Sequence, residues 1–85
     1  MSLRFEAHIE TQGGAGNLSR VVGVMALLDL TPLVLTSYGR PGGLSIDVQF
    51  VAGRREAELC LSRFQALVSV SSAAMHVAAD PLPDG

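Results

Sequence analysis

Hydrophobic and polar residues alternate strictly over the first part of the chain. Across residues 4–11, Phe5, Ala7 and Ile9 fall on one side, and charged or polar residues occupy the positions between them. A period of two is typical of a β-strand with one buried face. Residues 12–16 end the alternation, because a segment so rich in glycine is too flexible for either regular element.

After the glycines the hydrophobic period becomes that of a helix. Asn17 offers a side-chain oxygen that could cap the first turn. Over residues 18–30, leucine, valine and methionine recur every three or four positions, which predicts an amphipathic helix. Thr31-Pro32 ends it, because proline has no N–H to donate and restricts the residue before it.

Two further strands and a second helix follow. Residues 33–38 favour a strand, residues 41–43 a turn, and residues 44–50 alternate again, so the three segments predict a hairpin. An apolar stripe at helical spacing after Gly53 predicts the second helix. Residues 70–77 have the length and composition of a last strand.

The pattern of the last predicted strand does not decide which of its faces points inward. Ser71, Ala73, Met75 and Val77 form one face, the intervening residues form the other, and the pattern does not choose between them. The order of elements predicts an α+β, ferredoxin-like βαββαβ fold. Right-handed crossovers then give a four-stranded antiparallel sheet, in the order 4-1-3-2, with two helices on one face.

The core is expected where the two helical stripes meet the apolar face of the sheet. Its predicted members are aliphatic and aromatic: Phe5, Ile9, Val21, Val22, Met25, Ile46, Val48, Phe50, Ala57, Leu61 and Phe64. Cys60 lies on the stripe of the second helix, so we expect a buried and unreactive thiol.

Length and composition limit the chain to one small globular domain. It has 85 residues, 48% of them hydrophobic and 16% charged, which is enough for a single core. We expect the domain to span residues 1–79 and residues 80–85 to form a flexible C-terminal tail. Since no signal peptide or membrane-spanning run is evident, we expect a cytoplasmic protein without membrane contact.

The charged residues exclude some classes of function. A net charge of −2 with six scattered basic residues does not favour nucleic acid as a partner. The serines lack the flanking glycines of a nucleophile elbow. His8 and His76 fall in strands expected to be neighbours, but two histidines without carboxylate or thiolate support do not complete a metal site. We therefore expect no catalytic residue, no metal and no cofactor.

The glycine-rich turn is the best candidate for a binding site. It comprises Gly13, Gly14, Ala15, Gly16, Asn17 and Leu18. Free N–H groups at a helix start favour an anion such as a carboxylate, and glycine permits close approach. The turn is not a complete dinucleotide motif, because Ser19 replaces the third glycine. From these residues alone, an anion site and a merely flexible connection both stay open.

The second predicted strand lies at an edge of the sheet and carries no charge. Its residues Leu33, Val34, Leu35, Thr36 and Tyr38 would present apolar side chains and unpaired backbone groups to water. We therefore predict a homodimer that joins two such edges.

Residues 16–24, with the sequence GNLSRVVGV, resemble the Pro-Gly-x-Leu-Ser-Arg-Val-x-Gly opening of ACT domains in acetolactate synthase regulatory subunits. Residues 64–70 are similar to the segment that leads into the last strand of that family. The resemblance brackets residues 5–77, and in length the chain is similar to the short regulatory (small) subunit of that family. It implies a non-catalytic, allosteric module of branched-chain amino-acid biosynthesis. Such a module binds a small amino acid at residues 13–18 and modulates a large catalytic subunit such as acetolactate synthase.

The sequence departs from the family at the turn. The family's loop glycine falls on Gly16, but its ligand-contacting asparagine or aspartate falls on Gly13 and its usual proline on Ala15. Since that change removes a hydrogen bond to the ligand, a second function stays open, that of a structural accessory subunit that dimerises without an effector. An enzyme of the same fold class, such as an acylphosphatase, is disfavoured because residues 12–16 contain no arginine.

Overall fold

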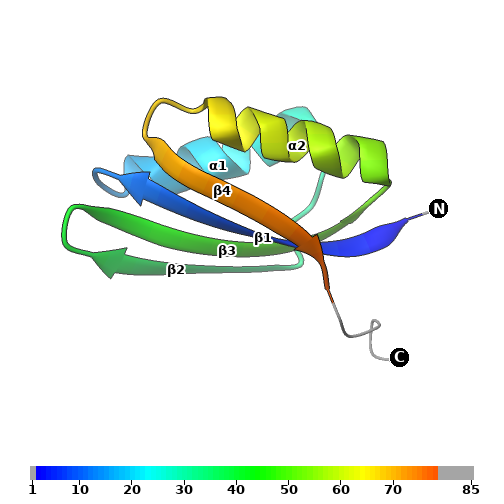
Figure 1. The fold of residues 1–85 in the computed structure, drawn as a ribbon, viewed down its shortest axis with the longest axis horizontal. Helices are drawn as coiled ribbons and strands as arrows, with labels where there is room; N and C mark the ends of the chain where they lie inside the picture. The colour runs from blue at the N-terminus through cyan, green and yellow to red at the C-terminus, as the bar shows by residue number, and fades with distance from the viewer. Residues whose placement is uncertain (1, 79–85) are drawn as a thin grey trace.

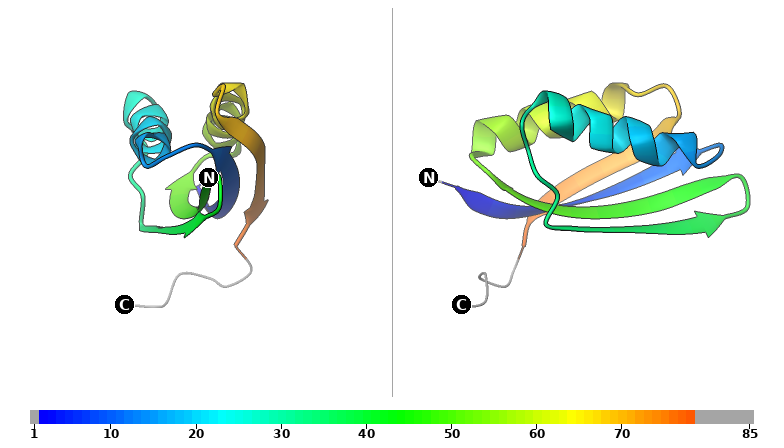
Figure 2. Two further views of the ribbon diagram at one scale, coloured as in Figure 1. Left: turned by 90° about the vertical axis from the view of Figure 1, so that its left-hand side faces the viewer. Right: turned by 180° about the vertical axis from the view of Figure 1, so that it is seen from behind.

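The computed structural model describes residues 2–78. The elements are β1 (Leu3–Gln12), α1 (Gly16–Leu27), β2 (Val34–Arg40), β3 (Gly43–Ala52), α2 (Arg54–Ala66) and β4 (Val70–Val77). The strands form one antiparallel sheet in the order β2-β3-β1-β4, and both helices lie on the same face of it (Figure 1). The views in Figure 2 show the opposite face of the sheet without a covering helix. The predicted ferredoxin-like fold and strand order are confirmed, and the expected tail, residues 80–85, lies outside the described residues.

The first helix ends at Leu27, three residues earlier than predicted. Asp29 takes the left-handed backbone conformation, with φ 56°, and its N–H donates to the carbonyl of Ala26 over 3.1 Å. The N–H of Leu30 donates to the carbonyl of Met25 over 2.9 Å. This pair of bonds is a Schellman motif, which satisfies the last carbonyls of the helix before Thr31-Pro32 is reached.

The edge strand β2 extends two residues beyond the predicted range, so the prediction of an uncharged edge is wrong at its end. The Arg40 guanidinium turns over β1, where Nε donates to Glu10 Oε1 over 3.0 Å and Nη2 donates to the carbonyl of Thr11 over 2.9 Å. Gly43 follows in β3. A Cβ at Gly43 would lie 1.8 Å from the carbonyl oxygen of Thr11, so this position accepts only glycine.

The core lies between the two helices and the sheet. It contains Phe5, Ala7, Ile9, Val21, Met25, Ile46, Val48, Phe50, Ala52, Ala57, Cys60 and Phe64. The rings of Phe5 and Phe50 stack across β1 and β3 with their centroids 6.0 Å apart. Most of the predicted core is confirmed, including Cys60. The prediction that Val22 belongs to the core is wrong, because Val22 is 39% exposed, and Leu61 is only half-buried. Each of the two lies about 100° around its helix from a buried neighbour.

The inward face of β4 is decided by an irregularity in its pairing with β1. Ala73 and Met75 pack against the core. The register shifts next to Glu10, so that beyond the shift Val70 also packs against the core and Ser71 is the extra residue. Neither alternating set of residues therefore faces inward along the whole strand.

We predict that Phe64→Ala lowers the free energy of unfolding by about 3–5 kcal/mol, because the ring is fully buried and its removal leaves a cavity. Chemical denaturation of the two proteins measures this loss. Val68→Ala is the control, because Val68 is fully exposed and should change the same quantity by less than about 0.5 kcal/mol. Equal midpoints for Phe64→Ala and the wild type would contradict the packing of α2.

Candidate functional site

The glycine-rich turn between β1 and α1 borders a hollow of about 210 Å³. The residues that line it are Gln12, Gly13, Gly14, Gly16, Asn17, Arg20 and Ser69. Two residues of the predicted site do not line it: Ala15 precedes the helix, and Leu18 turns inward against the core. The hollow brings together the end of β1, the first turn of α1 and the connection between α2 and β4.

Gly13 is the position in this turn that needs glycine. Its φ of 97° lies in the region that side chains with a Cβ rarely adopt. Its N–H donates to the carbonyl of Gly42 over 2.8 Å, which ties the turn to the hairpin of β2 and β3. Gly16, by contrast, has no positive φ, and a Cβ built there meets no atom within 4 Å.

Asn17 does not cap the helix, so this prediction is wrong. The N-cap position is Ala15, without a side-chain bond, and Asn17 is already the second residue of α1. Its side chain is 6% exposed and reaches back across the turn. Asn17 Nδ2 donates to the carbonyls of Gln12 over 2.8 Å and Gly14 over 3.1 Å, and its Oδ1 accepts a bond from the hydroxyl of Ser69. Asn17 thus fixes the shape of the turn.

The hollow is electrically positive. Within residues 2–78, the backbone N–H groups of Gly14, Ala15 and Gly16 have no hydrogen-bond partner, whereas the next two amides of the helix bond back into the turn. Arg20 lies one helical turn beyond Gly16 and is the charged residue among those that line the hollow. Unpaired amides, the positive end of the helix dipole and a guanidinium together favour an anion.

The sequence pattern did not indicate three of the residues that line the hollow, Gln12, Arg20 and Ser69. Arg20 could have been found, because a residue four positions after Gly16 lies above it on a helix. Ser69 could not, because it is separated from Asn17 by fifty-two residues and only the tertiary fold brings them together.

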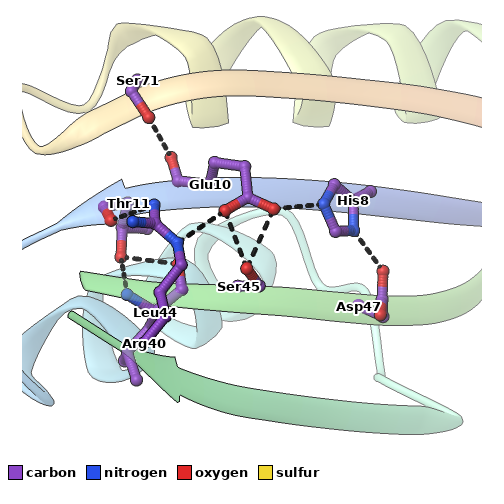
Figure 3. A network of polar contacts seen from close by, with 8 residues as sticks. All are labelled: His8, Glu10, Thr11, Arg40, Leu44, Ser45, Asp47 and Ser71. Atoms are coloured by element: carbon purple, nitrogen blue, oxygen red, sulfur yellow. Dashed lines mark hydrogen bonds and ion pairs between the residues drawn. The ribbon is translucent and has the colours of Figure 1, made fainter. Parts of the chain in front are cut away.

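A second polar cluster lies on the open face of the sheet (Figure 3). His8 Nδ1 lies 2.6 Å from Asp47 Oδ1, and its Nε2 contacts Glu10. His76 Nε2 lies 3.2 Å from Glu6 Oε1. The expectation that the histidines lack nearby carboxylates is therefore wrong, because strand register supplies them. Within residues 2–78, no group of three or more such side chains is arranged to hold a metal ion.

The thiol of Cys60 is not suited to chemistry. It is buried in the core, and burial raises its pKa to about 11. Since the thiolate is the reactive form, Cys60 stays protonated and unreactive near neutral pH.

The residues predicted for a dimer interface lie along the free edge of the sheet. Within the described sheet, β2 pairs with β3 alone. Leu33, Val34 and Tyr38 are 51%, 52% and 58% exposed, while Leu35 and Thr36 are half-buried. Val34 and Tyr38 project from the open face, whereas Leu35 packs against the core.

No protein-family model matches the sequence, and no curated protein matches it. The fold is similar to the crystal structure of the ACT domain from GTP pyrophosphokinase of Chlorobium tepidum. The identity is 12% and the TM-score 0.78, over 89% of this chain and 100% of that one. The regulatory subunit of aspartate kinase from Thermus thermophilus has an identity of 12% and a TM-score of 0.67, over 87% of this chain and 50% of that one. The C-terminal domain of the MgtC protein from Mycobacterium tuberculosis has an identity of 8% and a TM-score of 0.69, over 89% of this chain and 87% of that one. These likenesses show a shared fold.

None of the described helices combines the length and the hydropathy that crossing a membrane requires.

We predict that Asn17→Ala lowers the free energy of unfolding by about 1–3 kcal/mol, because it leaves buried polar groups of the turn without partners. Chemical denaturation measures the change. Asn17→Asp should also destabilise, because it retains the acceptor for Ser69 but loses both donors. Ser69→Ala should cost less than either, because it removes one bond, whereas Asn17→Ala removes three and Asn17→Asp two. An Asn17→Ala variant as stable as the wild type would show that Asn17 does not hold the turn.

Proposed function

We propose that this protein is a non-catalytic regulatory module of the ACT kind, which binds a small amino acid and modulates a partner enzyme. The observation that carries the proposal is the positive hollow at the start of α1. Within residues 2–78, the backbone N–H groups of two of its lining residues, Gly14 and Gly16, have no hydrogen-bond partner, and Arg20 lines the same hollow. The sequence resemblance at residues 16–24 supports it, since this segment forms the first two turns of that helix. The fold, shared with the ACT domain of GTP pyrophosphokinase, is consistent with it.

The carboxylate of the amino acid would meet the amides of Gly14 and Gly16, and the Arg20 guanidinium would face it from the next turn. Amides held in place by the fold lose little freedom on binding, so they are effective donors. None of the described residues that line the hollow carries a carboxylate to receive the ammonium group, and Gly13 offers no side chain. We therefore expect weak affinity, in roughly the high-micromolar range or about 5 kcal/mol.

The finer identity of the ligand and partner follows from the resemblance. It favours a branched-chain amino acid as effector and a large catalytic subunit such as that of acetolactate synthase as partner. The hollow supplies no feature that selects the side chain of the ligand, because its described lining is glycine and polar residues. We infer that a second subunit completes the site.

We propose that the second subunit is another copy of this chain, joined along β2. Leu33, Val34 and Tyr38 expose apolar surface there, and the backbone groups on the outer side of β2 face no other described strand. Pairing two β2 strands would satisfy the backbone groups, reduce the exposed apolar surface and extend the sheet across the dimer.

A structural accessory subunit that dimerises without an effector is the second candidate. One observation favours it: Gly13 has a φ of 97°, so the position that would contact a ligand in the family accommodates a side chain poorly. In that case the glycine-rich turn would only connect β1 to α1, and no ligand would bind in the hollow beside it.

We predict that valine, leucine or isoleucine binds the wild type with measurable heat and raises its unfolding temperature at millimolar concentration, because a ligand of the folded state stabilises it. Gly16→Val should abolish both signals, since its side chain would enter the hollow without an internal clash at Cβ. Gly23→Val is the matched control, because it lies in the same helix, where a Cβ also meets no atom within 4 Å. If a folded, dimeric wild type gives neither heat nor a thermal shift, the accessory role replaces the sensor role.

We predict that Val34→Lys weakens the dimer about tenfold or more without unfolding the chain, because Val34 belongs to the edge strand and its side chain is exposed on the open face. Light scattering over a range of micromolar concentrations reports the change. Leu35→Lys should instead reduce stability, because Leu35 packs against the core. A wild type that is monomeric throughout this range would contradict the interface.

A further inference from the structure

His8 is held between two carboxylates on the open face of the sheet (Figure 3). Its Nδ1 lies 2.6 Å from Asp47 Oδ1 on β3, and its Nε2 contacts Glu10 on β1. A neutral imidazole carries one N–H, so it can donate to only one of the two carboxylates. The other contact would then set a nitrogen lone pair against a carboxylate oxygen. The observed geometry therefore fits the imidazolium form, in which both nitrogens donate.

The strands on either side determine which other charges act on His8. On β1, Glu6 lies two residues away and is itself in contact with His76 of β4 over 3.2 Å. The residue of β4 directly opposite His8 is Ala74, which carries no charge. From β2, Arg40 reaches Glu10 Oε1 over 3.0 Å instead of His8.

Ser45 fixes the carboxylate of Glu10 on its other side. The Ser45 hydroxyl lies 2.7 Å and 2.9 Å from the two carboxylate oxygens. Hydrogen bonds lower the pKa of Glu10: the bond from Ser45 has the largest effect, and the bond from His8 has the next largest. Glu10 is therefore ionised whenever His8 titrates, and it cannot relieve the contact by taking up a proton itself.

We propose that His8 is a proton-operated clamp: charged, it joins the carboxylates of β1 and β3, and on losing its proton it releases one of them. The ring is 49% exposed, so protons exchange freely with solvent. The clamp stands apart from the positive hollow. His8 alternates along β1 with Ala7 and Ile9, which belong to the core under the helices, so its ring lies on the other face of the sheet.

Release of the clamp changes the charge of the open face. That face carries the carboxylates of Glu6, Glu10 and Asp47 against the guanidinium groups of Arg4 and Arg40. Loss of the proton from His8 removes one positive charge from this face. Asp47, one of the two carboxylates that His8 joins, also lines a hollow of about 270 Å³ on this face.

The sign of the effect on stability follows from the direction of the pKa. Hydrogen bonds to Asp47 and then to Glu10 raise the pKa of His8 in the folded protein above its ordinary value of 6.5. The stabilisation is therefore complete below the unfolded pKa and is lost as the pH rises through the folded pKa. Since His8 is half exposed, we expect the loss to be small but measurable.

The first test is an NMR titration of the imidazole signals between pH 5.5 and 9. The His8 signal of the wild type should have a midpoint above 6.5, and in Asp47→Asn the midpoint should fall, because that variant removes the partner at Nδ1. His76→Gln is the control, because it removes the other open-face histidine and should leave the His8 midpoint within about 0.2 pH units. A His8 midpoint at or below the ordinary value would overturn the proposal.

The second test is the free energy of unfolding over the same pH range, obtained with denaturant. It should decrease with rising pH in the wild type and in His76→Gln, and the decrease should be smaller in His8→Gln and Asp47→Asn. Equal decreases in His8→Gln and the wild type would overturn the clamp. Both tests use the protein without any amino acid, so their outcome is independent of the proposed effector site.

Discussion

The pairing of β1 with β3 determines both faces of this molecule. Phe5 opposite Phe50 places two stacked rings under the helices, and His8 opposite Asp47 places an imidazole beside a carboxylate on the other face. Because successive side chains of a strand point in opposite directions, a slip of one residue would bury His8 and expose Phe5. The core and the open-face cluster are therefore two consequences of the same register.

The positive hollow depends on how the chain leaves β1. At Gly13 a left-handed backbone turns the chain away from the sheet, and Asn17 then holds the turn by three hydrogen bonds from within the helix. The Asn17 side chain satisfies the carbonyls of Gln12 and Gly14 and the hydroxyl of Ser69, whereas the N–H groups of Gly14 and Gly16 have no partner within residues 2–78. A turn that is held in place and offers unpaired amides suits a small anion without reorganisation.

The two polar regions have opposite electrostatic design. The hollow at the start of α1 presents positive groups with no acidic neighbour among the residues that line it. On the open face the carboxylates already have partners: Gln49 and His76 for Glu6, Ser45 and Arg40 for Glu10, and His8 for Asp47. An anion would therefore be drawn to the helix end, whereas the open face responds to protons.

The sequence by itself determined the order of the elements, the strand order and most of the core, because these follow from periodicity and from rules of chain connection that act locally. It also located the break between β1 and α1, since glycine clusters mark breaks in regular structure. Only the tertiary structure decided the role of Asn17, whose partner Ser69 lies far along the chain, and the partners of His8, which come from register across strands. The inward face of β4 was likewise decided by a shift in pairing beside Glu10. Contacts between distant segments depend on how strands align, and a hydrophobic pattern within one segment carries no information about that alignment.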